Sequence, residues 1–115
     1  MNRLIRSFGA AFSGIRAAVS GQRNLKIHVG AALVVCAVGV YVDLNSEEWA
    51  LVAFAVGLVI SAELTNSAIE ALVDMVEPEM NPRAGRVKDI AAGAVLVAAI
   101  TAIIIGVLVF ARYFV

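Results

Sequence analysis

The stretch Trp49-ALVAFAVGLVISAELTNSAIEALV-Asp74 decides the fold of this chain. It is long enough to cross a membrane as one helix, because a span of ~30 Å needs roughly 20 mainly apolar residues. On a helix with 3.6 residues per turn, four polar side chains of its second half lie within about 80° of arc. These are Glu63, Asn66, Glu70 and Asp74. They form one polar stripe along an otherwise apolar helix.

Carboxylates inside a bilayer are costly, by roughly 2.5 kcal/mol or more at its centre. Three carboxylates on one helical face are therefore a strong functional signal. The stripe is expected to face a protein interior or a water-filled site, where ionisable residues of membrane helices usually act.

The composition is that of a membrane protein. Of the 115 residues, 62% are hydrophobic and 16% are charged, and the charges sum to zero. A soluble domain is closer to half apolar. No basic run indicates a nucleic-acid partner. The single cysteine, Cys36, excludes an internal disulfide, and no Cys/His cluster predicts a zinc site.

Three apolar stretches predict helical spans over residues 25–44, 49–76 and 88–115. Residues 2–21 have a different pattern, with apolar side chains on one face and arginines outside it, and predict an amphipathic helix at the membrane interface. A break is expected at Ser20-Gly21. The chain is therefore predicted to be an all-α membrane protein with one domain, residues 1–115.

The connection after the second span contains Pro78 and Pro82, and both are expected outside helices. Eight of the nine Lys and Arg residues precede the first span, open it or lie around this connection; Arg112 is the exception. Positive charges favour the cytoplasmic side. The N-terminus is therefore predicted in the cytoplasm and the C-terminus outside.

The polar residues converge on the cytoplasmic boundary of the membrane. Asp74 is near the end of the second span, and Glu63 is about 16 Å deeper at 1.5 Å per residue. Lys88 and Asp89 open the third span at the same boundary. Such a site suits a reaction between a lipid headgroup and a water-soluble anion. Two other readings stay open: a proton-relay or transporter protein, and a non-catalytic membrane bundle.

Three stretches carry a family resemblance: Glu63-LTNSAIEALV-Asp74, Gly85-RVKDIAAGA-Val95 and Arg23-NLKI-His28. At these residues the chain resembles the prokaryotic integral-membrane diacylglycerol and undecaprenol kinases. The resemblance implies a homotrimer with active sites shared between subunits, which transfers the γ-phosphate of ATP to a lipid hydroxyl with Mg²⁺. The last stretch resembles the undecaprenol branch, so undecaprenol is the favoured substrate and diacylglycerol the alternative. The enzyme is expected in the cell's inner (plasma) membrane.

The resemblance also implies roles for individual residues on the stripe. Glu63 would be the general base that takes the proton of the lipid hydroxyl. Asn66 would orient Glu63 or the phosphate, Glu70 would bind Mg²⁺, and Asp74 would support the nucleotide.

The remaining roles fall on other helices. Lys88 would pair with the phosphates of ATP, and Asp89 would orient Lys88 or contact the nucleotide. The family commonly has a metal-binding glutamate at the position of Gln22, which offers only a neutral amide oxygen. Gln22 is therefore expected to contact the metal weakly beside Glu70.

Overall fold

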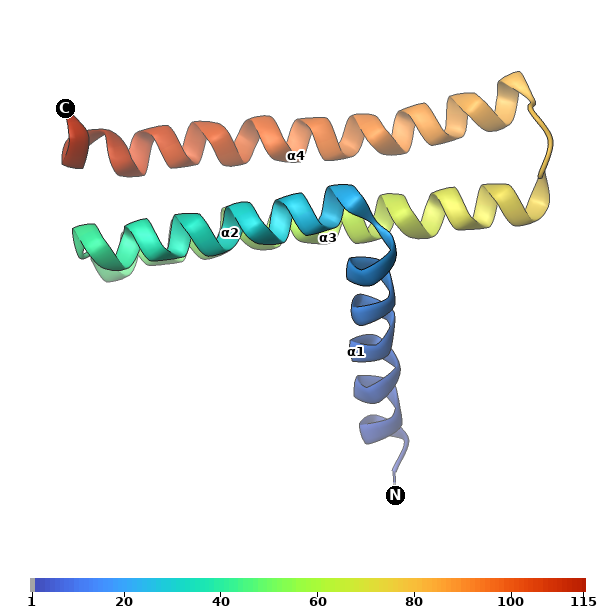
Figure 1. The fold of residues 1–115 in the computed structure, drawn as a ribbon, viewed down its shortest axis with the longest axis horizontal. Coiled ribbons are helices and arrows are strands. Elements are labelled where there is room, and N and C mark those ends of the chain that lie inside the picture. The colour runs from blue at the N-terminus through green and yellow to red at the C-terminus, as the bar shows by residue number, and fades with distance from the viewer. Residues whose placement is uncertain (1) are drawn as a thin grey trace.

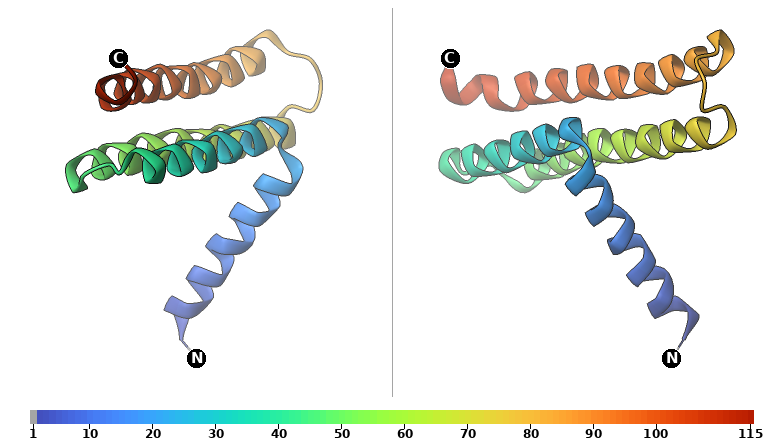
Figure 2. Two further views of the ribbon diagram at one scale, coloured as in Figure 1. Left: turned by 60° about the vertical axis from the view of Figure 1, so that its left-hand side comes forward. Right: turned by 45° about the vertical axis from the view of Figure 1, so that its right-hand side comes forward.

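The computed structural model describes residues 2–115 and contains four helices within them. They are α1 (Arg3–Gly21), α2 (Arg23–Val42), α3 (Ser46–Val76) and α4 (Pro82–Phe114). Helix α3 packs against both α2 and α4, and α1 leaves the bundle at a steep angle where α2 begins (Figures 1 and 2). The all-helical prediction is confirmed.

Helices α2, α3 and α4 have 20, 31 and 33 residues and are apolar enough to cross a membrane, as predicted. At 1.5 Å per residue, α3 and α4 are about 46 and 50 Å long, against a bilayer core of ~30 Å. The α3–α4 hairpin therefore extends past the start of α2, as Figure 1 shows. Because α3 and α4 are longer than the bilayer core, the same two helices can carry residues inside the membrane and residues in the water beside it.

Local capping sets the helix starts. The Asn45 side chain accepts a hydrogen bond from the Glu48 backbone, and Glu48 accepts one from the Asn45 backbone, so α3 begins at Ser46. The expectation that Pro82 lies outside a helix is wrong, because α4 begins there. Proline has no N–H to lose in the first turn and its φ suits that position. Asn81 caps the helix by accepting from the Arg83 backbone at 2.9 Å.

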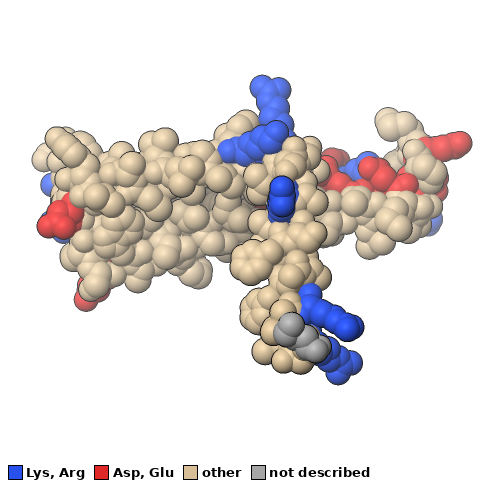
Figure 3. Space-filling model, turned by 60° about the horizontal axis from the view of Figure 1, so that its bottom comes forward, with Lys and Arg blue, Asp and Glu red and all other residues tan. Residues whose placement is uncertain are grey.

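Helix α1 spans nearly the predicted residues, but the chain breaks at Gln22, just after the expected Ser20-Gly21. Gln22 is extended, with φ −114° and ψ 117°. No residue of α1 is buried, and its large apolar side chains are exposed. Basic side chains gather where α1 projects from the bundle, whereas the surface between this region and the acidic end on the left of the view is uncharged (Figure 3). The interfacial position of α1 stays a prediction.

The buried apolar cluster lies at the end of the bundle away from the α3–α4 connection. Leu44, Val52 and Val109 form it, and Trp49 packs against them. Gly39 of α2 is buried here, and a Cβ atom on it would lie 2.7 Å from Trp49 Cη2. This close approach of backbone to indole requires glycine.

Most apolar side chains on the long helices point outward. In the most apolar windows of α2 and α4, only 11% of residues are buried inside the chain. Exposed apolar surface of this extent marks a membrane or protein interface. The finding agrees with helices that cross a membrane.

Candidate functional site

The polar stripe of α3 runs from a buried end to an exposed end. Glu63 and Asn66 are 3% and 8% exposed. Glu70 is half-buried, and Asp74 is exposed. The stripe therefore runs from the interior of the bundle toward the α3–α4 connection. All four residues lie on the same face of α3.

At the buried end, Glu63 meets a side chain of another helix. His28 of α2 places its Nε2 atom 3.3 Å from Glu63 Oε2. The resemblance at Arg23–His28 drew attention to this segment, but sequence analysis assigned His28 no role. A contact between α2 and α3 is visible only once the two helices are packed.

Asn66 and Glu70 are joined one turn further along. Asn66 Nδ2 donates to Glu70 Oε1 at 3.5 Å, so this hydrogen bond is long. The Asn66 Oδ1 atom is buried and has no hydrogen-bond partner among the described residues. A buried acceptor without a donor is uncommon. Asn66 thus offers a free oxygen close to a carboxylate.

The exposed end of the stripe is paired across the hairpin. Lys88 Nζ of α4 donates to Asp74 Oδ1 of α3 at 2.5 Å. Both side chains are open to solvent, at 36% exposed for Lys88 and 61% for Asp74. A surface pair of this kind contributes little to stability. Its ammonium is accessible to a phosphate.

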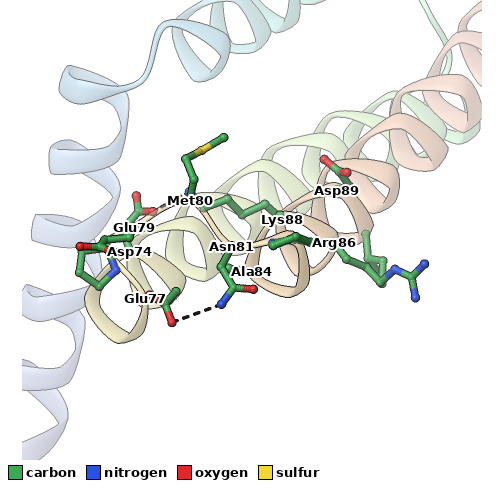
Figure 4. Close-up of a pocket in the computed structure, with 13 residues that line it drawn as sticks. Asp74, Glu77, Glu79, Met80, Asn81, Ala84, Arg86, Lys88 and Asp89 are labelled. Atoms are coloured by element: carbon green, nitrogen blue, oxygen red, sulfur yellow. Dashed lines mark hydrogen bonds and ion pairs between the residues drawn. The ribbon is translucent and has the colours of Figure 1, made fainter.

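Asp74 and Lys88 line an open cavity of about 890 Å³ at the α3–α4 connection (Figure 4). Asp89 lines it too, so the three residues predicted at this boundary come together. Glu77 and Arg86 are further charged residues on its wall. Sequence analysis missed both, because they lie in a segment expected to be a loop, where charges carry no specific signal.

Gln22 lies at the junction of α1 and α2 and is not among the residues that line this cavity. It is half-buried, and its side chain does not cap α2. Among residues 2–115, no group of three His, Cys, Asp or Glu side chains is close enough to hold a metal ion. A contact of Gln22 with a metal at Glu70 stays a prediction.

Fold and site together define a helical membrane protein with an acidic site that opens at one end of its helices. Residues 9–110 match the family model "Prokaryotic diacylglycerol kinase". The chain is 40% identical over 110 residues to an undecaprenol kinase of Bacillus subtilis, covering 96% of this chain and 89% of the relative. It is 34% identical over 102 residues to the diacylglycerol kinase of Escherichia coli K12, covering 89% and 84%.

The chain belongs to the prokaryotic diacylglycerol kinase family. It is therefore an enzyme, a phosphotransferase with an alcohol group as acceptor, and a lipid kinase that uses ATP. This assignment decides against the proton-relay protein and the non-catalytic bundle.

Proposed function

We propose that the chain is an undecaprenol kinase that transfers the γ-phosphate of ATP, with Mg²⁺, to the lipid hydroxyl. One observation carries the proposal. One face of α3 carries both buried Glu63, which lies beside α2, and solvent-exposed Asp74, which pairs with Lys88 of α4. A lipid hydroxyl reaches the first from the membrane, and a nucleotide reaches the second from water.

The choice of undecaprenol rests on two similarities. The chain is more similar to the undecaprenol kinase of Bacillus subtilis than to the diacylglycerol kinase of Escherichia coli, at 40% against 34% identity. The Arg23–His28 stretch also resembles the undecaprenol branch. Diacylglycerol, whose phosphorylation makes phosphatidic acid, is the second candidate.

Glu63 is the proposed general base. Its carboxylate takes the proton of the lipid hydroxyl while the hydroxyl oxygen bonds to the γ-phosphorus. The bond between that phosphorus and the bridging oxygen breaks, and ADP leaves with the bonding electrons. General-base catalysis of this kind is typically worth roughly 10²–10⁴-fold in rate.

The phosphates are proposed to lie between the stripe and Lys88. Phosphoryl transfer depends on positioning and on neutralising charge. The Lys88 ammonium can exchange its contact with Asp74 for phosphate oxygens, because both side chains are exposed. Asp74 and Asp89 would then contact the nucleoside side, and Asn66 would orient Glu63 or the γ-phosphate.

The residues on α3 fit a magnesium ion. Mg²⁺ prefers oxygen ligands and usually takes one or two carboxylates beside substrate phosphates. Glu70 supplies a carboxylate, and buried Asn66 Oδ1 lacks a hydrogen-bond donor. When bound, the ion would neutralise charge on the phosphates.

A homotrimer with shared sites is part of the proposal. One chain leaves its Asp74–Lys88 pair exposed and the α3–α4 cavity open, so a neighbouring subunit would complete the enclosure. The proposed location is the cell's inner (plasma) membrane. Helix α1 would lie in the cytoplasmic interface, with the N-terminus inside and the C-terminus outside, as the distribution of Lys and Arg predicts.

The test is a panel of lipid alcohols with labelled ATP, using the purified protein in nanodiscs. Undecaprenol should be phosphorylated with the highest kcat/KM, and turnover should need Mg²⁺. Faster use of diacylglycerol would replace the proposed substrate by the second candidate. No labelled lipid from any alcohol would refute the proposal.

A further inference from the structure

The buried carboxylate of Glu63 has one charged or polar contact within the part of the chain that the structure describes. That contact places His28 Nε2 3.3 Å from Oε2, and none of the side-chain hydrogen bonds among those residues involves Oε1. The two carboxylate oxygens are therefore unlike. Oε2 lies within ion-pair distance of a side chain on α2, and Oε1 is available to accept a proton.

His28 is well placed to hold that oxygen. It belongs to the second turn of α2, whose backbone is helical on both sides of it. Its side chain is only a quarter exposed. A histidine loses less conformational freedom on being held than a lysine or arginine would, because its side chain is shorter and stiffer.

His28 also borders an apolar cavity of about 330 Å³ between α2, α3 and α4. The other described residues that line this cavity are apolar, among them Ala31, Val35 and Phe110. On this wall the imidazole is the one polar group. No other polar side chain on this wall can compete for the imidazole, so Glu63 is the available partner of its Nε2 atom.

We infer that His28 is a positioning residue for the reaction: it holds Glu63 Oε2 so that Oε1 faces the lipid hydroxyl. This rests on the proposed role of Glu63 as base. A carboxylate that lacks such a partner can rotate, and a small misplacement of a catalytic group is costly in rate. His28 therefore acts through Glu63 and does not itself contact the transferred phosphate.

The first test compares His28→Leu with His28→Gln. The Gln amide nitrogen is separated from Cα by as many bonds as His Nε2, so it can still donate to Glu63, whereas leucine cannot. His28→Leu should lower kcat at least about tenfold but by less than removal of the base, which is worth roughly 10²–10⁴-fold. KM for lipid and for ATP should stay within about twofold, and His28→Gln should recover most of the loss. Cys36→Ala, an exposed position on α2, is the control.

The second test uses the Glu63→Gln background. If His28 works through the carboxylate, His28→Leu should lower the residual rate by less than about twofold there, because coupled residues are not additive. A full additional loss in that background would overturn the inference. So would a folded His28→Gln variant as slow as His28→Leu, or an unchanged kcat in His28→Leu.

A third measurement does not need turnover or a leucine variant that folds. The imidazole ¹⁵N signals of His28 should differ between the wild type and Glu63→Gln, since the carboxylate next to Nε2 is replaced. Identical signals would overturn the inference. If the wild type phosphorylates no lipid alcohol but its ¹⁵N signals still differ from those of Glu63→Gln, the proposed function is refuted, whereas the contact between the two side chains is supported.

Discussion

Arg112 forms a bidentate ion pair with Glu48 at the end of the α3–α4 hairpin opposite to Asp74 and Lys88. Arg112 Nε donates to Glu48 Oε2 and Nη2 donates to Oε1, both at 2.9 Å. Tyr113 donates its hydroxyl proton to the same carboxylate, and the Arg112 guanidinium lies over the Tyr113 ring. Glu48 also completes the capping box of α3. One carboxylate thus links the start of α3 to the end of α4.

Arg112→Gln should lower the unfolding temperature of the protein in nanodiscs. The planar guanidinium matches the carboxylate in a way that an amide cannot. Glu48→Gln should do the same, and the double variant should be little worse than either single one, because the two residues act on each other. Arg83→Gln, an exposed arginine at the other end of the hairpin, is the control. Additive losses in the double variant would show that the pair is not coupled.

Gly39→Ala should destabilise the protein by about 1–3 kcal/mol, the usual cost of overpacking. The new Cβ would lie 2.7 Å from Trp49 Cη2 and 2.9 Å from Leu44 Cδ1, so the indole must move. Gly30→Ala on the same helix is the matched control, since its Cβ would meet nothing within 4 Å. The measurement is the stability of both variants by chemical or thermal unfolding. Equal stability of the two variants would contradict the packing seen at Trp49.

Glu63→Gln should remove nearly all phosphoryl transfer while the protein stays folded. The amide is similar in shape but cannot take a proton, and a general base is worth roughly 10²–10⁴-fold. Turnover is measured at saturating lipid and ATP, with Glu47→Gln at an exposed position of α3 as the control. A variant that keeps more than about a tenth of wild-type turnover would fall short of that range.

Lys88→Met should raise KM for ATP more than KM for lipid. Lys88 lies on the first turns of α4, beside Asp74 and on the wall of the open cavity, where phosphates can reach its ammonium. Two saturation curves, one for each substrate, measure the effect. The phosphate role would be refuted by an unchanged ATP curve together with a shifted lipid curve.

Gln22→Glu should lower the Mg²⁺ concentration that gives half-maximal turnover. If Gln22 lies near a metal held by Glu70, a second negative charge adds Coulomb attraction of about one or more kcal/mol at an effective dielectric constant of ~20. The Mg²⁺ concentration for half-maximal turnover should then fall roughly tenfold, at about 1.4 kcal/mol per decade. Turnover is measured against free Mg²⁺ at fixed MgATP. Superimposable curves would place Gln22 away from the metal.

The sequence by itself determined the features that depend on neighbours along one helix. Apolar runs of sufficient length predicted the three long helices, because backbone groups in lipid must be satisfied within each segment. The spacing of Glu63, Asn66, Glu70 and Asp74 predicted one face, because helix geometry is local. The expectation for Pro82 was wrong because proline is common at the first helical position as well as in loops.

Only the tertiary structure decided which helices meet through which side chains. Lys88 contacts Asp74 from 14 residues away, and Arg112 contacts Glu48 from 64 residues away. The contact of His28 with Glu63 likewise joins two helices. In a soluble protein, apolar patterning would point each helix toward the core. In a membrane helix, lipid-facing and protein-facing residues are equally apolar, so the pattern has no direction and packing of small and polar groups selects the partners.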